Sequence, residues 1–120
     1  MANEVTVTAT LTVDNGNVQM DKSITKSVTM TGNVVQNGVQ EIGTSDEQVT
    51  IVADVGTYGY ILVRNLDSSN YIELATTDSS PQYLVKLKAG EIALFRCGAN
   101  ALYGKANTAA CDLEYWLVED

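Results

Sequence analysis

Residues Val5–Val13 read VTVTATLTV, so that every odd position is apolar and every even position is threonine. An alternation of period two places the apolar side chains on one face of a β-strand and the hydroxyl groups on the other. The next four residues, Asp14-Asn15-Gly16-Asn17, contain an Asn-Gly pair, which suits the positive φ angles of a tight hairpin turn. The opening of the chain therefore predicts a half-buried strand followed by a hairpin.

A returning strand should start near Val18 and be best defined over Ser23–Thr31. Its apolar side chains share a face with Lys22 and Lys26, and the strand is apolar only in its second half. This pattern is typical of an edge strand or an arm. Residues 1–31 are therefore predicted to form an N-terminal hairpin or arm, whose first strand, Glu4–Val13, either completes the edge of the sandwich or reaches onto a neighbouring subunit.

Strand-forming residues dominate the rest of the chain as well, because Val and Thr are frequent and only one Pro is present. Short strands joined by loops are expected over Gly32–Ser45. About eight short antiparallel strands at this spacing predict an all-β fold, a single β-sandwich domain over residues 1–120 that is jelly-roll-like. The remaining strands are expected at Gln48–Ala53, Tyr58–Leu66, Tyr71–Ala75, Tyr83–Lys88, Ile92–Cys97, Leu102–Ala106 and Cys111–Val118.

Length and charge limit the functions that the chain can perform. A chain of 120 residues can bury a core of its own. Fifteen Asp and Glu against seven Lys and Arg give a net charge of −8, so no nucleic-acid partner is expected. The chain has no His, the commonest general base and transition-metal ligand. We therefore predict no catalytic residue, no cofactor and no metal site, and the protein is not expected to be an enzyme.

The start of the chain and the two cysteines bear on the cellular compartment. Glu4 lies where a secretory signal needs a basic start, and no apolar run is long enough to span a bilayer. We therefore expect synthesis in a cytosol, no export signal and no membrane partner. Cys97 and Cys111 are predicted to be buried, reduced thiols, with a bridge between them as the alternative.

Carboxylates that are close in the sequence indicate solvated surface rather than a catalytic pair. Asp46 and Glu47 lie in a polar loop, Asp112 and Glu114 alternate outward along a strand, and Glu119 and Asp120 lie at an end of the chain that is expected to fray. The run Asp67–Asn70 lacks the residue order of a calcium-binding loop and indicates an Asx-type turn.

The aromatic residues are the remaining candidates for a binding site, because Tyr and Trp rings can stack on sugars. Strand parity assigns Tyr83 and Tyr115 to the core. Trp116 instead shares a face with Asp112 and Glu114, and a large indole on an outward face indicates a subunit interface. The alternative is a strand that is buried on both faces. The candidate interface residues are thus Val5, Val7, Thr8 and Trp116.

Four segments carry a resemblance to a known class of proteins. They are Gly59–Asp67 (GYILVRNLD), Asn70–Leu74 (NYIEL), Lys86–Arg96 (KLKAGEIALFR) and Leu113–Trp116 (LEYW). Together they resemble small virion structural proteins of tailed bacteriophages, in which a G-y-i-x-x-R-N-l-D segment, an l-K-x-G-E-x-a-x-f-R segment and a short aromatic-acidic terminus recur. The resemblance implies a β-sandwich, no catalysis and assembly in many copies.

The function expected from this resemblance is that of a capsid decoration, or cement, protein of a bacteriophage. Such a homo-oligomer, expected as a trimer, would be made in the host bacterial cytoplasm and bind the phage major capsid protein on the outer capsid surface. The alternatives are a tail, neck or fibre component of the virion and, from another class, a virion-attached carbohydrate-binding module.

Overall fold

The computed structural model describes residues 2–120, which form ten β-strands and no helix. None of these residues therefore belongs to a helix that could cross a membrane. They divide into two compact units, a first that ends at Thr31 and a second that covers Gly32–Asp120. The predicted all-β class is confirmed.

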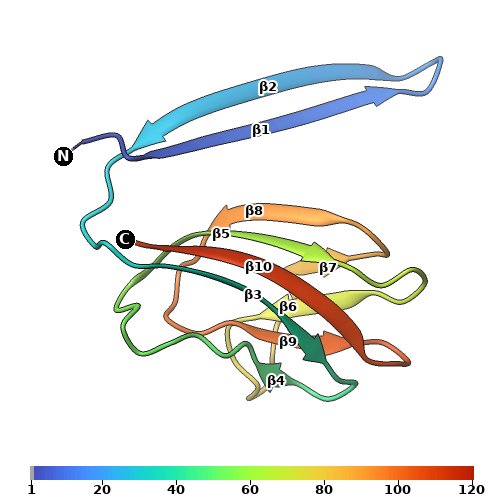
Figure 1. The fold of residues 1–120 in the computed structure, drawn as a ribbon. Helices are drawn as coiled ribbons and strands as arrows, with labels where there is room; N and C mark the ends of the chain where they lie inside the picture. Colours follow the sequence, from blue (N-terminus) through green and yellow to red (C-terminus); the bar gives the residue numbers. More distant parts are fainter. Residues whose placement is uncertain (1) are drawn as a thin grey trace. The chain divides into compact units, whose positions relative to one another are not determined.

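The first unit is a long antiparallel hairpin of β1 (Val5–Asp14) and β2 (Gln19–Val28) (Figure 1). Every residue of β1 has a partner in β2, from Val5 opposite Val28 to Asp14 opposite Gln19. The predicted start of the returning strand near Val18 is confirmed, since β2 begins at Gln19, directly after the turn. The range Ser23–Thr31 is too short at its beginning and too long at its end, because β2 ends at Val28, opposite the first residue of β1.

The hairpin turn has the chemistry that its Asn-Gly pair predicts. Gly16 has a φ of 68°, a left-handed conformation that glycine adopts at little cost. The backbone N–H of Asn15 donates to the carbonyl of Val18 at 2.8 Å, and the N–H of Gly16 donates to the Asp14 carboxylate at 3.3 Å.

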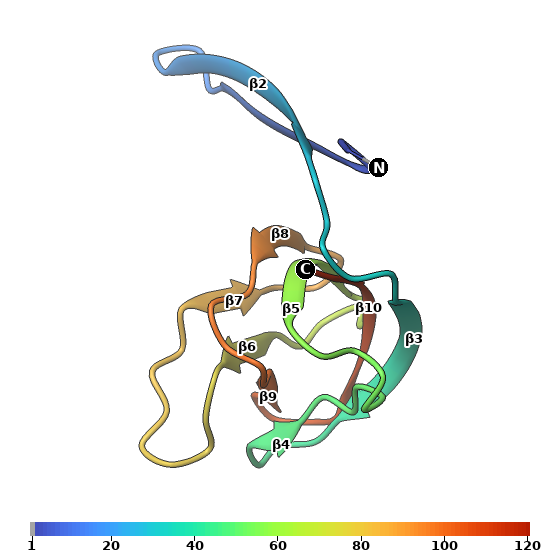
Figure 2. The ribbon, with the colours of Figure 1, turned by 90° about the vertical axis from the view of Figure 1, so that its left-hand side faces the viewer.

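The second unit, all of which the structure describes, is a sandwich of two four-stranded antiparallel sheets (Figures 1 and 2). The first sheet has the strand order β3-β10-β5-β8 and the second has the order β4-β9-β6-β7. This is the strand order of a jelly roll, which confirms the predicted fold. The strands are β3 (Val35–Ile42), β4 (Glu47–Gln48), β5 (Tyr58–Asn65), β6 (Ile72–Ala75), β7 (Val85–Leu87), β8 (Ile92–Arg96), β9 (Tyr103–Ala106) and β10 (Cys111–Glu119).

A single apolar core lies between these sheets. β10 shows the alternation that builds it, because Leu113, Tyr115 and Leu117 are buried while the residues between them face outward. The side chains that are almost completely buried are Ile42, Val49, Ile61, Val63, Ile72, Leu74, Leu87, Cys111, Leu113 and Leu117.

Two expectations about the start of the sandwich are wrong. Residues Val35–Ile42 form one eight-residue strand, not short strands joined by loops, because β3 pairs with β10 along its whole length. Conversely, only Glu47 and Gln48 of the region around Gln48–Ala53 are in a strand. Pairing with β10 makes Val35–Ile42 one continuous strand. Most of the residues after Gln48 in this region, in contrast, have no strand beside them to pair with.

Two glutamine side chains of β3 replace that ladder. The side-chain amide of Gln36 accepts from the N–H of Val52 at 2.8 Å and donates to the carbonyl of Thr50 at 3.2 Å. The amide of Gln40 accepts from the N–H of Thr50 at 2.8 Å and donates to the carbonyl of Gln48 at 3.0 Å. The backbone of this segment is hydrogen-bonded without a neighbouring strand, which sequence periodicity cannot reveal.

Two residues of the segment Gly59–Asp67 have clear structural roles. The side chain of Asn65 is completely buried, donates to the carbonyls of Asn70 and Leu87 at 2.9 and 3.0 Å, and accepts from the N–H of Asp67 at 2.9 Å. It joins the end of β5 to the end of β7. At the start of β5, a Cβ on Gly59 would lie 2.7 Å from the carbonyl oxygen of Val118, so only glycine fits there.

Glu119 is a second polar joint, at the end of β10. Its carboxylate accepts from the N–H groups of Asn33 and Val34 at 2.9 and 3.2 Å and from that of Gly56 at 2.8 Å. These hydrogen bonds, above all that from Gly56, lower the pKa of Glu119. The prediction that Glu119 is a solvated carboxylate at a frayed end is therefore wrong, because three backbone N–H groups hold it. The carboxylate holds the beginning of the sandwich chain, before β3, against its end.

Candidate interaction surfaces

The outer face of the β3-β10-β5-β8 sheet carries a cluster of apolar side chains, and one row of the register places Glu114 of β10 between Val39 of β3 and Arg64 of β5. Trp116 lies at its centre, opposite Leu62 of β5 and Asn37 of β3, and Leu62 in turn lies opposite Leu94 of β8. We call this set the apolar sheet face. It consists of Val35, Val39, Tyr60, Leu62, Ile92, Leu94, Trp116 and Val118.

Several of these side chains are strongly exposed. Val35 retains 69% of its accessible surface and Ile92 66%, and Trp116 retains 38%. Single exposed apolar residues are ordinary, but contiguous patches on a soluble protein mark sites of interaction. Trp116 therefore lies on an outward face, as predicted, within a patch that is larger than one residue.

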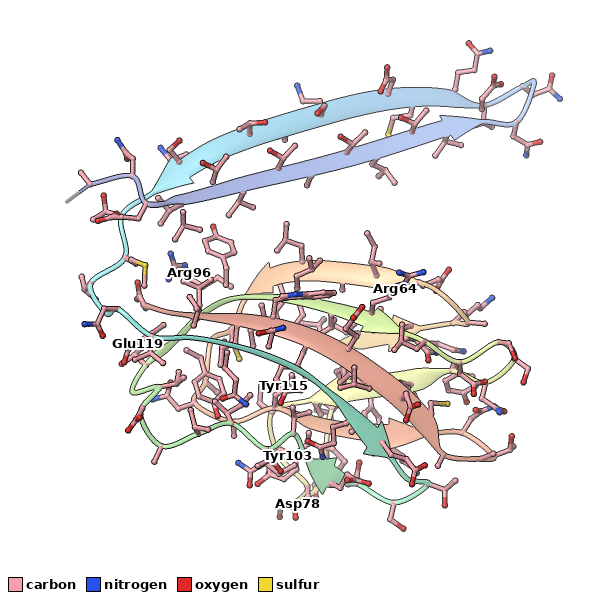
Figure 3. All side chains as sticks on the ribbon, viewed as in Figure 1. Arg64, Asp78, Arg96, Tyr103, Tyr115 and Glu119 are labelled. Atoms are coloured by element: carbon pink, nitrogen blue, oxygen red, sulfur yellow. The ribbon has the colours of Figure 1, made fainter. Side chains whose placement is uncertain are left out.

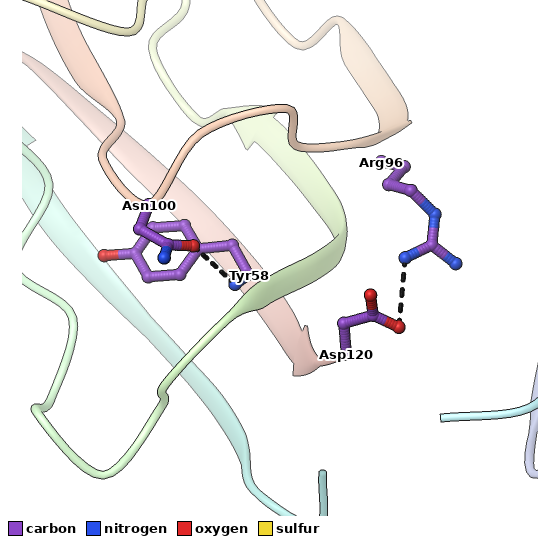
Figure 4. Close-up of polar contacts among 4 residues, drawn as sticks. All are labelled: Tyr58, Arg96, Asn100 and Asp120. Atoms are coloured by element: carbon purple, nitrogen blue, oxygen red, sulfur yellow. Dashed lines mark hydrogen bonds and ion pairs between the residues drawn. The ribbon is translucent and has the colours of Figure 1, made fainter. Parts of the chain in front are cut away.

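Charged residues border this face. Glu41 and Asp112 are directly opposite each other on β3 and β10, which gives one end of the face a concentrated negative charge. At the other end, Arg96 forms an ion pair with Asp120 at 3.2 Å (Figure 4). The Arg96 guanidinium also lies 4.7 Å from the ring centroid of Tyr60. Arg64 also projects from the outer side of the sheet, as Figure 3 shows.

The outer face of the other sheet, β4-β9-β6-β7, has the opposite character. Glu73 of β6 lies between Lys86 of β7 and Lys105 of β9 in the strand register. The Lys86 ammonium lies 4.2 Å from the centroid of the Tyr71 ring, a favourable cation–π contact. We call this the charged sheet face, and it is typical of a sheet surface in contact with water.

The hairpin presents two faces of different chemistry. One is a ladder of hydroxyl groups, in which Thr8 bonds to Thr25 at 3.1 Å and Thr10 to Ser23 at 3.0 Å. The other, here called the apolar hairpin face, is formed by Val5, Val7, Ala9, Leu11, Val13, Met20, Lys22, Ile24, Lys26 and Val28.

The four predicted interface residues thus lie on three different surfaces. Val5 and Val7 belong to the apolar hairpin face, whereas Thr8 belongs to the hydroxyl ladder behind it. Trp116 lies on the apolar sheet face. Sequence analysis missed Ile92 and Leu94, because the run from Ile92 to Arg96 is apolar on both faces and its parity alone does not show which one is outward.

Most aromatic rings are engaged within the protein. Tyr115 is buried, as predicted, and its hydroxyl donates to the carbonyl of Thr50 at 3.2 Å. Tyr83 is only half-buried and lies outside the core, contrary to prediction, because its hydroxyl donates to the Asp46 carboxylate. That hydrogen bond, with desolvation and the nearby negative charges, raises the pKa of Tyr83 to about 12. Tyr58 is buried beside Asn100, which accepts from its backbone N–H at 2.9 Å (Figure 4).

Both cysteines are buried and unbridged, as predicted. The Cys97 thiol donates to the carbonyl of Ala99 at 3.1 Å, and the Cys111 thiol donates to that of Ala109 at 3.5 Å. Burial raises the pKa of Cys111, which disfavours the reactive thiolate.

The loop after β5 is the predicted Asx-type turn. The Asp67 carboxylate accepts from the N–H groups of Ser69 at 2.9 Å and Asn70 at 2.6 Å, and these bonds lower the pKa of Asp67. Over residues 2–120, no three His, Cys, Asp or Glu side chains are arranged to hold a metal ion.

An apolar groove of about 460 Å³ opens at the edge of the sandwich, between β6 and β7 of one sheet and the end of β8 in the other. Phe95, Cys97 and Leu102 form part of its lining, and Leu84 stands at its rim with 93% of its surface exposed.

Comparison of the chain with protein-family models, with curated proteins and with solved structures found no match. The interpretation of these surfaces therefore depends on their chemistry.

Proposed function

We propose that the chain is a virion structural protein, and that it serves as a capsid decoration protein bound to the outer surface of a bacteriophage shell. The observation that carries this proposal is the apolar sheet face with Trp116 at its centre. A folded domain with its own core gains nothing from leaving such a face in water, whereas a protein that docks on other subunits requires one.

The contrast between the two outer faces supports the same proposal. A decoration protein has one side against the shell and one side in solvent. The apolar sheet face suits the bound side and the charged sheet face, with Glu73, Lys86 and Lys105, suits the exposed side. The resemblance of four segments to virion proteins of tailed bacteriophages is the sequence argument, and the phage major capsid protein is the proposed partner.

The mechanism would be purely associative. A protein that binds the assembled shell but not its separated subunits stabilises the assembled state in proportion to its binding free energy. Trp116 is suited to be the main anchor, since tryptophan side chains at the centres of interfaces contribute strongly to binding.

The first test is the copy number of the protein in purified particles, measured by quantitative gel staining. A decoration protein is expected in a number comparable to that of the shell subunits. A number that is a small fraction of this would instead assign the protein to the tail, neck or fibres.

The second test is binding of the purified protein to shells that lack it, measured by co-sedimentation. The Trp116→Ala variant is expected to bind at least about tenfold more weakly, whereas Lys86→Ala on the charged sheet face should bind normally. Equal binding by both variants would exclude the apolar sheet face as the docking surface.

A carbohydrate-binding module is the alternative from another class. Sugar binding usually needs exposed aromatic rings, and Tyr58, Tyr71, Tyr83 and Tyr115 are buried or have intramolecular partners. The surface therefore favours a protein partner over a glycan, and a glycan array tests this directly.

A further inference from the structure

The hairpin of β1 and β2 requires a partner surface. No residue between 2 and 31 is buried, and a two-stranded hairpin alone is marginally stable in water at best. Leu11 and Ile24 on its apolar face retain 59% and 58% of their accessible surface. Covering this face is the direct way to stabilise the hairpin.

The strands of the apolar sheet face are long enough to cover the hairpin. Strands of ten residues extend over about 33 Å, and β10 with nine residues is nearly as long. Two antiparallel sheets pack well when apolar side chains interdigitate between them, as in any β-sandwich. The hairpin would add a third layer on the outside of the first sheet.

The charges of the two faces are complementary. The apolar hairpin face carries Lys22 and Lys26, opposite Leu11 and Val7 in the hairpin register. The outer face of the first sheet carries Glu114 and ends in the adjacent carboxylates of Glu41 and Asp112. Of its two cations, Arg64 lies opposite Glu114 in the strand register and Arg96 is paired with Asp120, so the unpaired charge of this face is negative. Opposite charges at the rim of an interface favour one orientation and speed association.

The segment that joins the hairpin to the sandwich is short. β2 ends at Val28, and the N–H groups of Asn33 and Val34 are held by the Glu119 carboxylate. Only about three residues separate the last ladder pair from Gly32, where any side chain would overlap Glu119. A short, restrained hinge favours exchange of an element between copies over closure on its own chain.

We propose that the apolar hairpin face of one copy packs on the apolar sheet face of a second copy of this chain. Each copy donates a hairpin and accepts another, so two copies can exchange hairpins in a closed dimer, or several copies can pass them on around a closed ring. The proposal rests on the proposed function in treating both faces as assembly surfaces. Because one face cannot be covered by two partners at once, the hairpin of a second copy would cover the apolar sheet face in the free protein and give it up to the shell on docking.

The oligomeric state of the full-length protein and its variants tests this, measured by sedimentation velocity over a range of concentrations. Ile24→Asp on the hairpin and Leu94→Asp on the sheet should each weaken self-association at least about tenfold. Two matched controls should leave it unchanged. Thr25→Asp places the same charge on the hydroxyl ladder, and Leu84→Asp repeats the leucine substitution at an exposed site outside the face.

A mixture of the two interface variants distinguishes exchange from other modes of association. Ile24→Asp keeps an intact sheet face and Leu94→Asp keeps an intact hairpin, so one good contact can form between them. We expect the equimolar mixture to form heterodimers where each variant alone is monomeric. Thermal melts of each variant establish that its sandwich is folded.

Three results would overturn the proposal: a wild-type protein that is monomeric at every concentration, controls that dissociate as readily as the interface variants, or a mixture that shows no heterodimer. The shell co-sedimentation assay is separate. If the protein self-associates normally but does not bind shells, only the capsid proposal is contradicted. If a strictly monomeric protein binds shells normally, only the exchange of hairpins between copies is contradicted.

Discussion

The outer face of the β3-β10-β5-β8 sheet is apolar and that of the β4-β9-β6-β7 sheet is charged, although both sheets bury the same core. One carries Trp116, Ile92 and Val35, and the other carries Glu73 between Lys86 and Lys105. A sheet in a sandwich needs only one buried face to be stable. The difference between the outer faces therefore concerns what each sheet meets outside the domain, and not how the domain folds.

The largest expected effect separates the inside of the first sheet from its outside. Leu113 is completely buried, whereas Glu114 beside it faces outward. Leu113→Ala should lower the free energy of unfolding by about 2 to 5 kcal/mol, because it removes apolar contacts and leaves a cavity. Chemical denaturation measures the loss, and Glu114→Ala is the control on the same strand. Similar effects for both would contradict the assignment of the two faces.

The next effect is expected at the centre of the apolar sheet face. Trp116→Ala should leave thermal unfolding of dilute monomer nearly unchanged while weakening self-association or shell binding by about 2 kcal/mol or more. A loss of about 3 to 5 kcal/mol in monomer stability would show instead that the indole is part of the core.

Lowering the pH should reduce the stability of the sandwich through protonation of Glu119, at the end of β10. Its hydrogen bonds lower the folded-state pKa below the ordinary value of 4.5, so the carboxylate stabilises the fold above that value and loses this contribution as the pH falls through the folded pKa. Denaturant midpoints measured across the acid range should fall in the wild type. Glu119→Gln should be less stable near neutral pH and should show a smaller acid-dependent decrease, and an identical decrease in both proteins would argue against this role.

Raising the pH should reduce the stability of the sandwich through ionisation of Tyr83, just before β7. The pKa of this phenol is raised from 10.0 to about 12 in the folded protein. Its contribution to folding stability is therefore complete when the pH is below the ordinary pKa of 10.0, and it is lost as the pH rises through the folded-state pKa. Tyr83→Phe should lack this loss, and absorbance of the ionised phenol can follow the titration. Titration of every tyrosine near its ordinary pKa would contradict the raised value.

The smallest effect is expected on the charged sheet face. Lys86→Ala removes the contact with the Tyr71 ring and should cost about 0.5 to 1 kcal/mol of stability, with no change in self-association. A clear loss of association would show that the charged face also takes part in assembly.

The local sequence pattern was sufficient to predict the features that depend only on residues adjacent in the chain. The VTVTATLTV alternation and the Asn-Gly turn predicted β1 and the hairpin, and the parity of β10 assigned Leu113 and Tyr115 to the core and Trp116 to the outside. These predictions succeed because a strand places successive side chains on opposite faces whatever lies beside it. The buried cysteines and the jelly-roll class followed from the same reasoning.

Only the tertiary structure decided features that depend on which strands are neighbours. The pairing with β10 made β3 a continuous strand, and the side chains of Gln36 and Gln40 replaced a ladder for the segment after Gln48. The apolar sheet face exists because the outward positions of β3, β5, β8 and β10 meet on one side. Such contacts join residues far apart in sequence, and their free energies depend on packing that no local pattern records.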